Sequence, residues 1–148
     1  MNRVRLLIVA LLTTSLFFVG LGSATAHDNE RQGKRTAADI VYLHDTAYAK
    51  GDKVVVQAVY KCWGDGWDIK TRVKLTQRDG AQYSGRAKGL TCDGKKHDQW
   101  VELWKDGHKK INNGGALLRW KYEKNGYTLD YAKKWVKVVG ASGGDHHR

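Results

Sequence analysis

The sequence predicts an all-β domain, built as a two-layer antiparallel β-sandwich of about seven strands with one disulfide. Three observations support this prediction. Asp-Gly and Asn-Gly turn pairs recur between short runs rich in β-branched and aromatic residues. Apolar and polar residues alternate within several of these runs, with the two-residue period of a half-buried strand. The chain has two cysteines, Cys62 and Cys92, each at one end of a strand-like run.

The first 26 residues have the pattern of a cleaved signal peptide. Arg3 and Arg5 provide a basic start, residues 6–21 are mainly apolar, and residues 23–26 end in the small residues that signal peptidases cut after. The apolar stretch is shorter than the roughly 20 residues of a membrane span, and polar residues interrupt it. We therefore expect cleavage after Ala26, a secreted product, and no transmembrane segment in the mature chain.

The mature chain is expected to form one domain. Residues 27–148 number 148 − 26 = 122, which is enough for a single hydrophobic core. We expect a flexible polar segment over 27–38, the β-domain over 39–140 and a flexible tail over 141–148. Loss of the two arginines in the signal leaves 24 basic and 15 acidic residues, a net charge of +9. Such a charge favours anionic partners.

The first four expected strands are bounded by turn residues. The run 40–48 has mixed alternation and is compatible with a strand or with partly extended coil. The run 53–63 has one apolar set that we expect to point inward: Val54, Val56, Ala58, Tyr60 and Cys62. The run 67–78 alternates most regularly, and one of its faces is formed by Ile69, Thr71, Val73, Leu75 and Gln77. The run 82–92 follows an Asp-Gly turn and ends at the second cysteine.

Three further strands are expected after the second cysteine. In the run 99–105, Trp100 and Trp104 share a face, which we expect to lie in the core. The run 116–124 has one apolar face, formed by Ala116, Leu118, Trp120 and Tyr122. The run 127–139 has aromatic residues four apart, a helical spacing, but its β-branched valines favour a strand. One apolar and one polar face per strand fit a two-layer sandwich.

Cys62 and Cys92 are expected to form a structural disulfide. A zinc site needs more ligands, and Cys62 has no second cysteine or histidine nearby. A catalytic thiol would have to stay reduced outside the cell, where disulfides persist. We therefore expect no metal ion and no cofactor.

The cysteine-flanking residues also resemble a pattern in known proteins. The pattern is similar to that of small secreted actinobacterial proteins whose function is not established. It consists of Tyr60-Lys61-Cys62, then Cys92-Asp93-Gly94 followed by His97 and Trp100, then Gly115-Ala116. The resemblance covers residues 53–139. It implies an immunoglobulin-like antiparallel β-sandwich and secretion, and it transfers no active site. This chain departs from the pattern in being richer in Lys and Trp and in lacking proline.

The polar face of the run 67–78 is the first candidate site. It consists of the cations Lys70, Arg72, Lys74 and Arg78, which could be joined by Arg86, Lys88, Arg119 and Lys121. Alternate residues on a strand lie about 6.6–6.8 Å apart, comparable to the spacing of phosphates along a polyanion. An anionic cell-wall polymer or acidic polysaccharide is therefore the expected partner, and no specific nucleic-acid recognition is predicted. The alternative is that a solvated outer face merely carries the lysines that limit aggregation.

The loop over residues 62–68 is the second candidate. Trp63 and Trp67 flank a Gly-Asp-Gly turn, so two indoles could stack on a sugar ring while nearby carboxylates accept from its hydroxyls. The alternative is that both rings fold back to cover the disulfide and the core.

No catalytic motif is present. The sequence has no Gly-x-Ser-x-Gly elbow, no His-Glu-x-x-His pair and no phosphate-binding loop. We therefore expect a secreted, non-catalytic module that binds an anionic or carbohydrate ligand at the cell envelope. A small secreted effector, acting as an inhibitor or antibacterial toxin on a protein or membrane, is the alternative. A hydrolase is the third, because the distance between carboxylates in space is not readable from sequence. The oligomeric state stays open.

Overall fold

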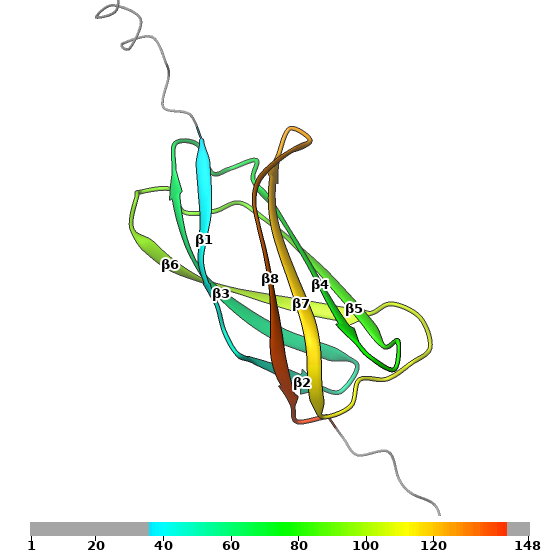
Figure 1. Ribbon diagram of the computed structural model, residues 1–148. Coiled ribbons are helices and arrows are strands. Elements are labelled where there is room, and N and C mark those ends of the chain that lie inside the picture. The colour runs from blue at the N-terminus through cyan, green and yellow to red at the C-terminus, as the bar shows by residue number, and fades with distance from the viewer. Residues whose placement is uncertain (1–35, 142–148) are drawn as a thin grey trace, which may run out of the picture. The chain divides into compact units, whose positions relative to one another are not determined.

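The computed structural model describes residues 36–141, and within them the chain folds entirely into β-strands and their connections (Figure 1). The strands are β1 (Ala37–Leu43), β2 (Thr46–Lys50), β3 (Lys53–Trp63), β4 (Lys70–Gln77), β5 (Gln82–Lys88), β6 (Lys96–Lys105), β7 (Gly114–Lys124) and β8 (Tyr127–Val139). The predicted signal peptide, most of the predicted polar segment and residues 142–148 of the predicted tail lie outside the described residues. None of residues 36–141 belongs to a helix that could cross a membrane.

The sheet closes into a barrel, so the predicted immunoglobulin-like antiparallel β-sandwich is wrong. Seven strands follow one another in the order β3-β2-β8-β7-β4-β5-β6, and β6 then pairs with β3 to complete the ring. The closing contact is long, because residues Lys53 to Lys61 of β3 are each paired with a residue of β6. The remaining strand, β1, pairs with β3. A barrel strand also has one inner and one outer face, so the alternation in the sequence is equally compatible with both architectures.

The inner faces predicted for three strands are confirmed. The residues predicted to point inward from β3, β4 and β7 are all buried: Val54, Val56, Ala58, Tyr60, Cys62, Thr71, Val73, Leu75, Gln77, Ala116, Leu118, Trp120 and Tyr122. Ile69, which precedes β4, is buried as well. The inward face of each of these strands was therefore readable from local alternation.

The first expected strand is two strands, β1 and β2. The break falls at His44 and Asp45, whose backbone groups bond elsewhere: His44 N donates to Gln57 O, and Lys137 N donates to Asp45 O. After this break β2 runs parallel to β8 while remaining antiparallel to β3. The mixed alternation of the run reflects the break between the two strands, the added pairing of β2 with β8 and a bulge in β1.

Trp100 and Trp104 point outward, so their predicted place in the core is wrong. Their side chains are 56% and 57% exposed, whereas Val101 and Leu103 are buried. Because both faces of this run carry apolar residues, the alternation alone did not distinguish the inner face from the outer one.

Gly85 permits the close approach of β5 to β6. A Cβ atom at this position would lie 2.3 Å from Glu102 O and 2.7 Å from Leu103 Cδ2. The ladder between the two strands is short, with Tyr83 opposite Lys105 and Ser84 opposite Trp104. A glycine inside a strand often marks such an approach of a second backbone.

Candidate functional site

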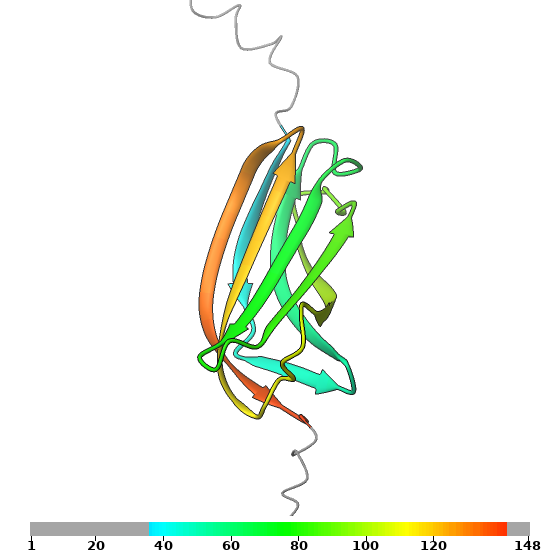
Figure 2. The same cartoon turned by 90° about the vertical axis from the view of Figure 1, so that its right-hand side faces the viewer.

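The outer surfaces of β5, β4, β7 and β8 form one continuous positively charged face. Figure 2 shows these strands side by side, and the ladders β5–β4, β4–β7 and β7–β8 connect them. We call this surface the basic wall and define it by its outward cations: Lys70, Arg72, Lys74, Arg86, Lys88, Arg119, Lys121 and Lys133. The structure thus brings seven sequence-predicted cations together and adds Lys133, which the sequence reasoning missed.

The strand register places like charges next to one another. Arg72 of β4 is opposite Arg86 of β5 on one side and Lys121 of β7 on the other. In the next row, Lys74 is opposite Arg119, which in turn is opposite Lys133 of β8. Like charges directly opposite each other destabilise a sheet. An outer face selected only for solubility would mix both signs of charge, so this clustering favours the ligand interpretation.

A groove lies within the basic wall. It has a volume of about 260 Å³, and its lining includes the cations Arg72, Lys74, Arg86, Arg119 and Lys121. Tyr131, which is 48% exposed, lies at the same groove. A concave surface holds a ligand's charged groups near several cations at once and restricts the water that would screen them.

Glu123 neutralises only part of this charge. Its carboxylate binds Arg72 Nε and, at 2.5 Å, Lys121 Nζ. The hydrogen bond from Lys121 is the largest cause that holds the pKa of Glu123 below its usual range. Within residues 36–141, no carboxylate forms an ion pair with Lys74, Arg86 or Arg119. The groove therefore keeps a net positive charge.

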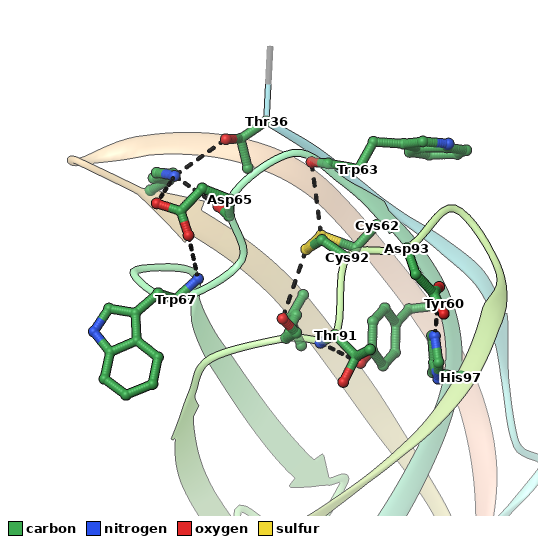
Figure 3. The surroundings of a disulfide bond; sticks show 12 residues. Thr36, Tyr60, Cys62, Trp63, Asp65, Trp67, Thr91, Cys92, Asp93 and His97 are labelled. Carbon is green, nitrogen blue, oxygen red and sulfur yellow. Dashed lines mark hydrogen bonds and ion pairs between the residues drawn. A yellow bond between two sulfur atoms is a disulfide. The ribbon is translucent and has the colours of Figure 1, made fainter. Parts of the chain in front are cut away.

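The predicted disulfide between Cys62 and Cys92 is present, with a Cα–Cα distance of 4.2 Å (Figure 3). It lies against the loop over residues 62–68, which we call the tryptophan loop, because Gly66 packs directly against the disulfide. A Cβ atom at Gly66 would lie 2.2 Å from Leu90 O and 2.4 Å from Cys92 Sγ. The loop and the disulfide therefore form one packed unit.

The structure does not bring the two predicted indoles of the loop together. Figure 3 shows Trp63 and Trp67 on opposite sides of the disulfide. Trp63 is 38% exposed and its ring lies close to Gly94, whereas Trp67 is 76% exposed. Two rings that diverge in this way do not form a common platform for one sugar ring.

The carboxylates near the loop are engaged in local contacts. Asp65 Oδ1 accepts a hydrogen bond from Trp67 N at 3.0 Å, and this bond is the largest cause that lowers the pKa of Asp65. Asp68 forms an ion pair with Lys88 at 3.4 Å. These contacts hold the shape of the loop, and they leave fewer carboxylate lone pairs for a ligand.

Replacing Gly66 by alanine is expected to lower the free energy of unfolding by about 1–3 kcal/mol. The added methyl group would overlap a backbone carbonyl and a disulfide sulfur, which have little freedom to move. Urea denaturation measures the change. Gly115→Ala is the matched control, because a Cβ atom there meets nothing within 4 Å. Equal stability of the two variants would show that the loop is not packed on the disulfide.

Arg78 lies apart from the other predicted cations. It follows the last residue of β4, and its guanidinium carbon lies 5.6 Å from the centroid of the Trp135 ring.

No group of three or more His, Cys, Asp or Glu side chains within residues 36–141 is placed to hold a metal ion.

Comparison with known proteins assigns no family to this chain. No family model and no curated protein matches the sequence. Among solved structures, the crystal structure of wild-type OgpA from Akkermansia muciniphila is similar, with 14% sequence identity and a TM-score of 0.38. The match covers 68% of this chain and 27% of the OgpA chain. At this level of similarity it carries no conclusion about function.

Proposed function

We propose that this protein is a secreted, non-catalytic module that binds an anionic polymer of the cell envelope through the basic wall. The observation that carries the proposal is the groove lined by five cations. Two of them, Arg72 and Lys121, form ion pairs with the carboxylate of Glu123. The disulfide supports an oxidising compartment, in agreement with the signal-like start of the sequence.

The spacing of the cations suits a ligand with repeated negative charges. Neighbouring strands lie about 4.7–4.9 Å apart, and alternate residues along a strand lie about 6.6–6.8 Å apart. The wall therefore presents its cations as a two-dimensional array and not as a single point. A polymer can contact several of them at once, which raises affinity without requiring any one strong contact.

The carboxylates beside the wall favour binding over catalysis. Glu123 binds two cations, and Asp68 pairs with Lys88. A general acid or base needs a pKa near the working pH, whereas the pKa of Glu123 is held low. These contacts fit carboxylates that adjust the local charge of the wall.

Reversing three groove charges is expected to weaken polyanion binding about tenfold or more. The variant Lys74→Glu/Arg86→Glu/Arg119→Glu removes cations that lack a carboxylate partner within residues 36–141. An exposed ion pair contributes about 0.2–1 kcal/mol, and each reversal also adds a repulsion, so three together exceed the roughly 1.4 kcal/mol of a tenfold change. Titration of the protein with polyphosphate and with polygalacturonate measures the loss. Wild-type binding should fall with added salt.

The control for that experiment is Lys50→Glu/Lys95→Glu/Lys96→Glu, which changes the net charge equally on β2, β6 and the connection before β6. It is expected to retain most of the affinity. If both variants lose binding to the same extent, net charge alone attracts the polymer and the basic wall is not a site.

The effector alternative is favoured by a different surface. Tyr48, Trp100 and Trp104 are all more than half exposed, and they lie on β2 and β6 on either side of β3. Exposed Trp and Tyr side chains are enriched at protein–protein interfaces. An effector that docks through this face would keep its target when the basic wall is reversed, and that outcome separates the two candidates.

A further inference from the structure

A second cavity lies beyond the end of β4, outside the groove described above. It has a volume of about 390 Å³, and the residues that matter for its chemistry are Arg78, Asp79, Asn112, Asn113, Gly115 and Trp135. We call it the β4-end hollow. Its size lies within the range of sites for small ligands, about 300–1,000 Å³.

The hollow has a floor of bare backbone at Gly115. The neighbouring Ala116 is buried, so Gly115 faces outward by the alternation of β7. A Cβ atom there would meet no heavy atom within 4 Å, and the backbone of Gly115 is not in the left-handed region. Other residues would fit this position without strain, but their side chains would occupy the hollow.

An indole and a guanidinium form the walls. Trp135 is 56% exposed, and Arg78 lies 5.6 Å from its ring centroid. An exposed indole offers an apolar surface for the C–H face of a sugar ring. Within residues 36–141 no carboxylate pairs with Arg78, so its planar N–H groups remain available for a carboxylate, which guanidinium binds in a bidentate manner.

The third side is a loop that is rigid and rich in hydrogen-bonding groups. The buried Gln77 donates to Asn112 O at 2.7 Å and accepts from Asn112 N at 2.9 Å. Asn112 Nδ2 donates to Asp79 Oδ2 at 3.1 Å, and Asn113 bonds both backbone groups of Ala141. Asp79 Oδ1 also accepts from Ala81 N at 2.9 Å, so both carboxylate oxygens of Asp79 are engaged within the loop. The loop is therefore ordered before any ligand arrives, and the Asn112 amide oxygen can still accept from hydroxyl groups.

The hollow continues the outer surface of the basic wall. Arg78 immediately follows β4, four residues after Lys74, and Trp135 lies two residues beyond Lys133 on β8. A polymer bound to the wall can therefore extend along β4 into the hollow.

We propose that the β4-end hollow binds a uronate residue, a pyranose ring that bears a carboxylate, within an acidic polysaccharide. Trp135 packs against the ring, Arg78 binds the carboxylate, and the Asn112 amide oxygen accepts from a hydroxyl, while Asp79 holds the loop in place. The inference rests on the proposed function and narrows its ligand from anionic polymers in general to carboxylated polysaccharides.

Two variants test the hollow. Trp135→Ala removes the stacking surface, and Gly115→Leu fills the cavity from its floor. Each is expected to weaken binding of an oligogalacturonate about tenfold, the usual size of a loss at a central aromatic contact, while polyphosphate binding stays at the wild-type level. Trp104→Ala is the matched control, because Trp104 is as exposed as Trp135 but lies on β6. Circular dichroism should show all three variants folded.

The outcomes separate this inference from the proposed function. If both hollow variants bind oligogalacturonate like the wild type while the groove reversal abolishes binding, the proposed function stands and the hollow is not a uronate site. If the hollow variants weaken polyphosphate equally, or if the wild type binds maltohexaose as tightly as oligogalacturonate, the carboxylate assignment is wrong. If the wild type binds neither polyanion, the proposed function itself fails.

Discussion

Replacing Cys62 and Cys92 together by alanine is expected to lower the free energy of unfolding by about 3–4 kcal/mol. The crosslink joins residues 30 positions apart, and its loss allows the unfolded chain many more conformations. Such a loss is a large share of the roughly 5–15 kcal/mol that stabilises a typical domain. Urea denaturation of the variant and the wild type, in the absence of reductant, measures the difference.

Reductant provides the control for the disulfide experiment. Wild-type protein in dithiothreitol should lose nearly as much stability as the double variant loses, and the variant itself should not respond to dithiothreitol. Unchanged stability of the double variant would contradict the expectation. Under conditions where both proteins are folded, ligand binding should be unaffected, because the hollow and the disulfide lie at opposite ends of β4, which is roughly 25 Å long.

Local patterns in the sequence predicted strands and faces well. The alternation from Lys70 to Gln77 is regular, and a shift by one residue would bury a row of cations. The inner face of β4 was therefore readable without knowledge of any neighbouring strand. The same holds for β3 and β7, whose inner residues are consistently apolar.

The closure of the sheet could not be predicted in this way. It depends on the pairing of β3 with β6, which brings Val56 opposite Val101, residues far apart in the sequence. Alternation describes each strand by itself and does not name its partner. The outward position of Trp100 was missed for a related reason, because residues on both faces of β6 are apolar.

The candidate site was predicted in part. The cations of β4 follow from its alternation, and the sequence also suggested the neighbouring Arg86 and Arg119. The hollow was not foreseen, because Trp135 meets Arg78 only through the pairing of β8 with β7 and of β7 with β4. Gly115 lies outside the expected run 116–124, although it belongs to β7, and a glycine within a strand can mark a place where a ligand approaches the backbone.

Replacing Trp120 by alanine is expected to lower the free energy of unfolding by about 3–5 kcal/mol. The Trp120 side chain is fully buried in the middle of β7, and its register partners are Val73 of β4 and Ala132 of β8. These small neighbours leave room for the indole and cannot fill the space if it is removed. A barrel interior of this kind is filled by side chains, so the lost volume remains as a cavity. Urea denaturation measures the effect.

Trp104→Ala is the matched control for the Trp120 experiment. Trp104 is 57% exposed, and Lys53 Nζ lies 5.7 Å from the centroid of its ring. Its loss should cost at most about 1 kcal/mol. The predicted sandwich placed both tryptophans in one core, so it expects similar losses from the two variants, whereas the barrel expects a large loss from Trp120 alone. Comparable destabilisation by both would therefore contradict the register in which β6 closes the barrel, since that register turns Trp104 toward solvent.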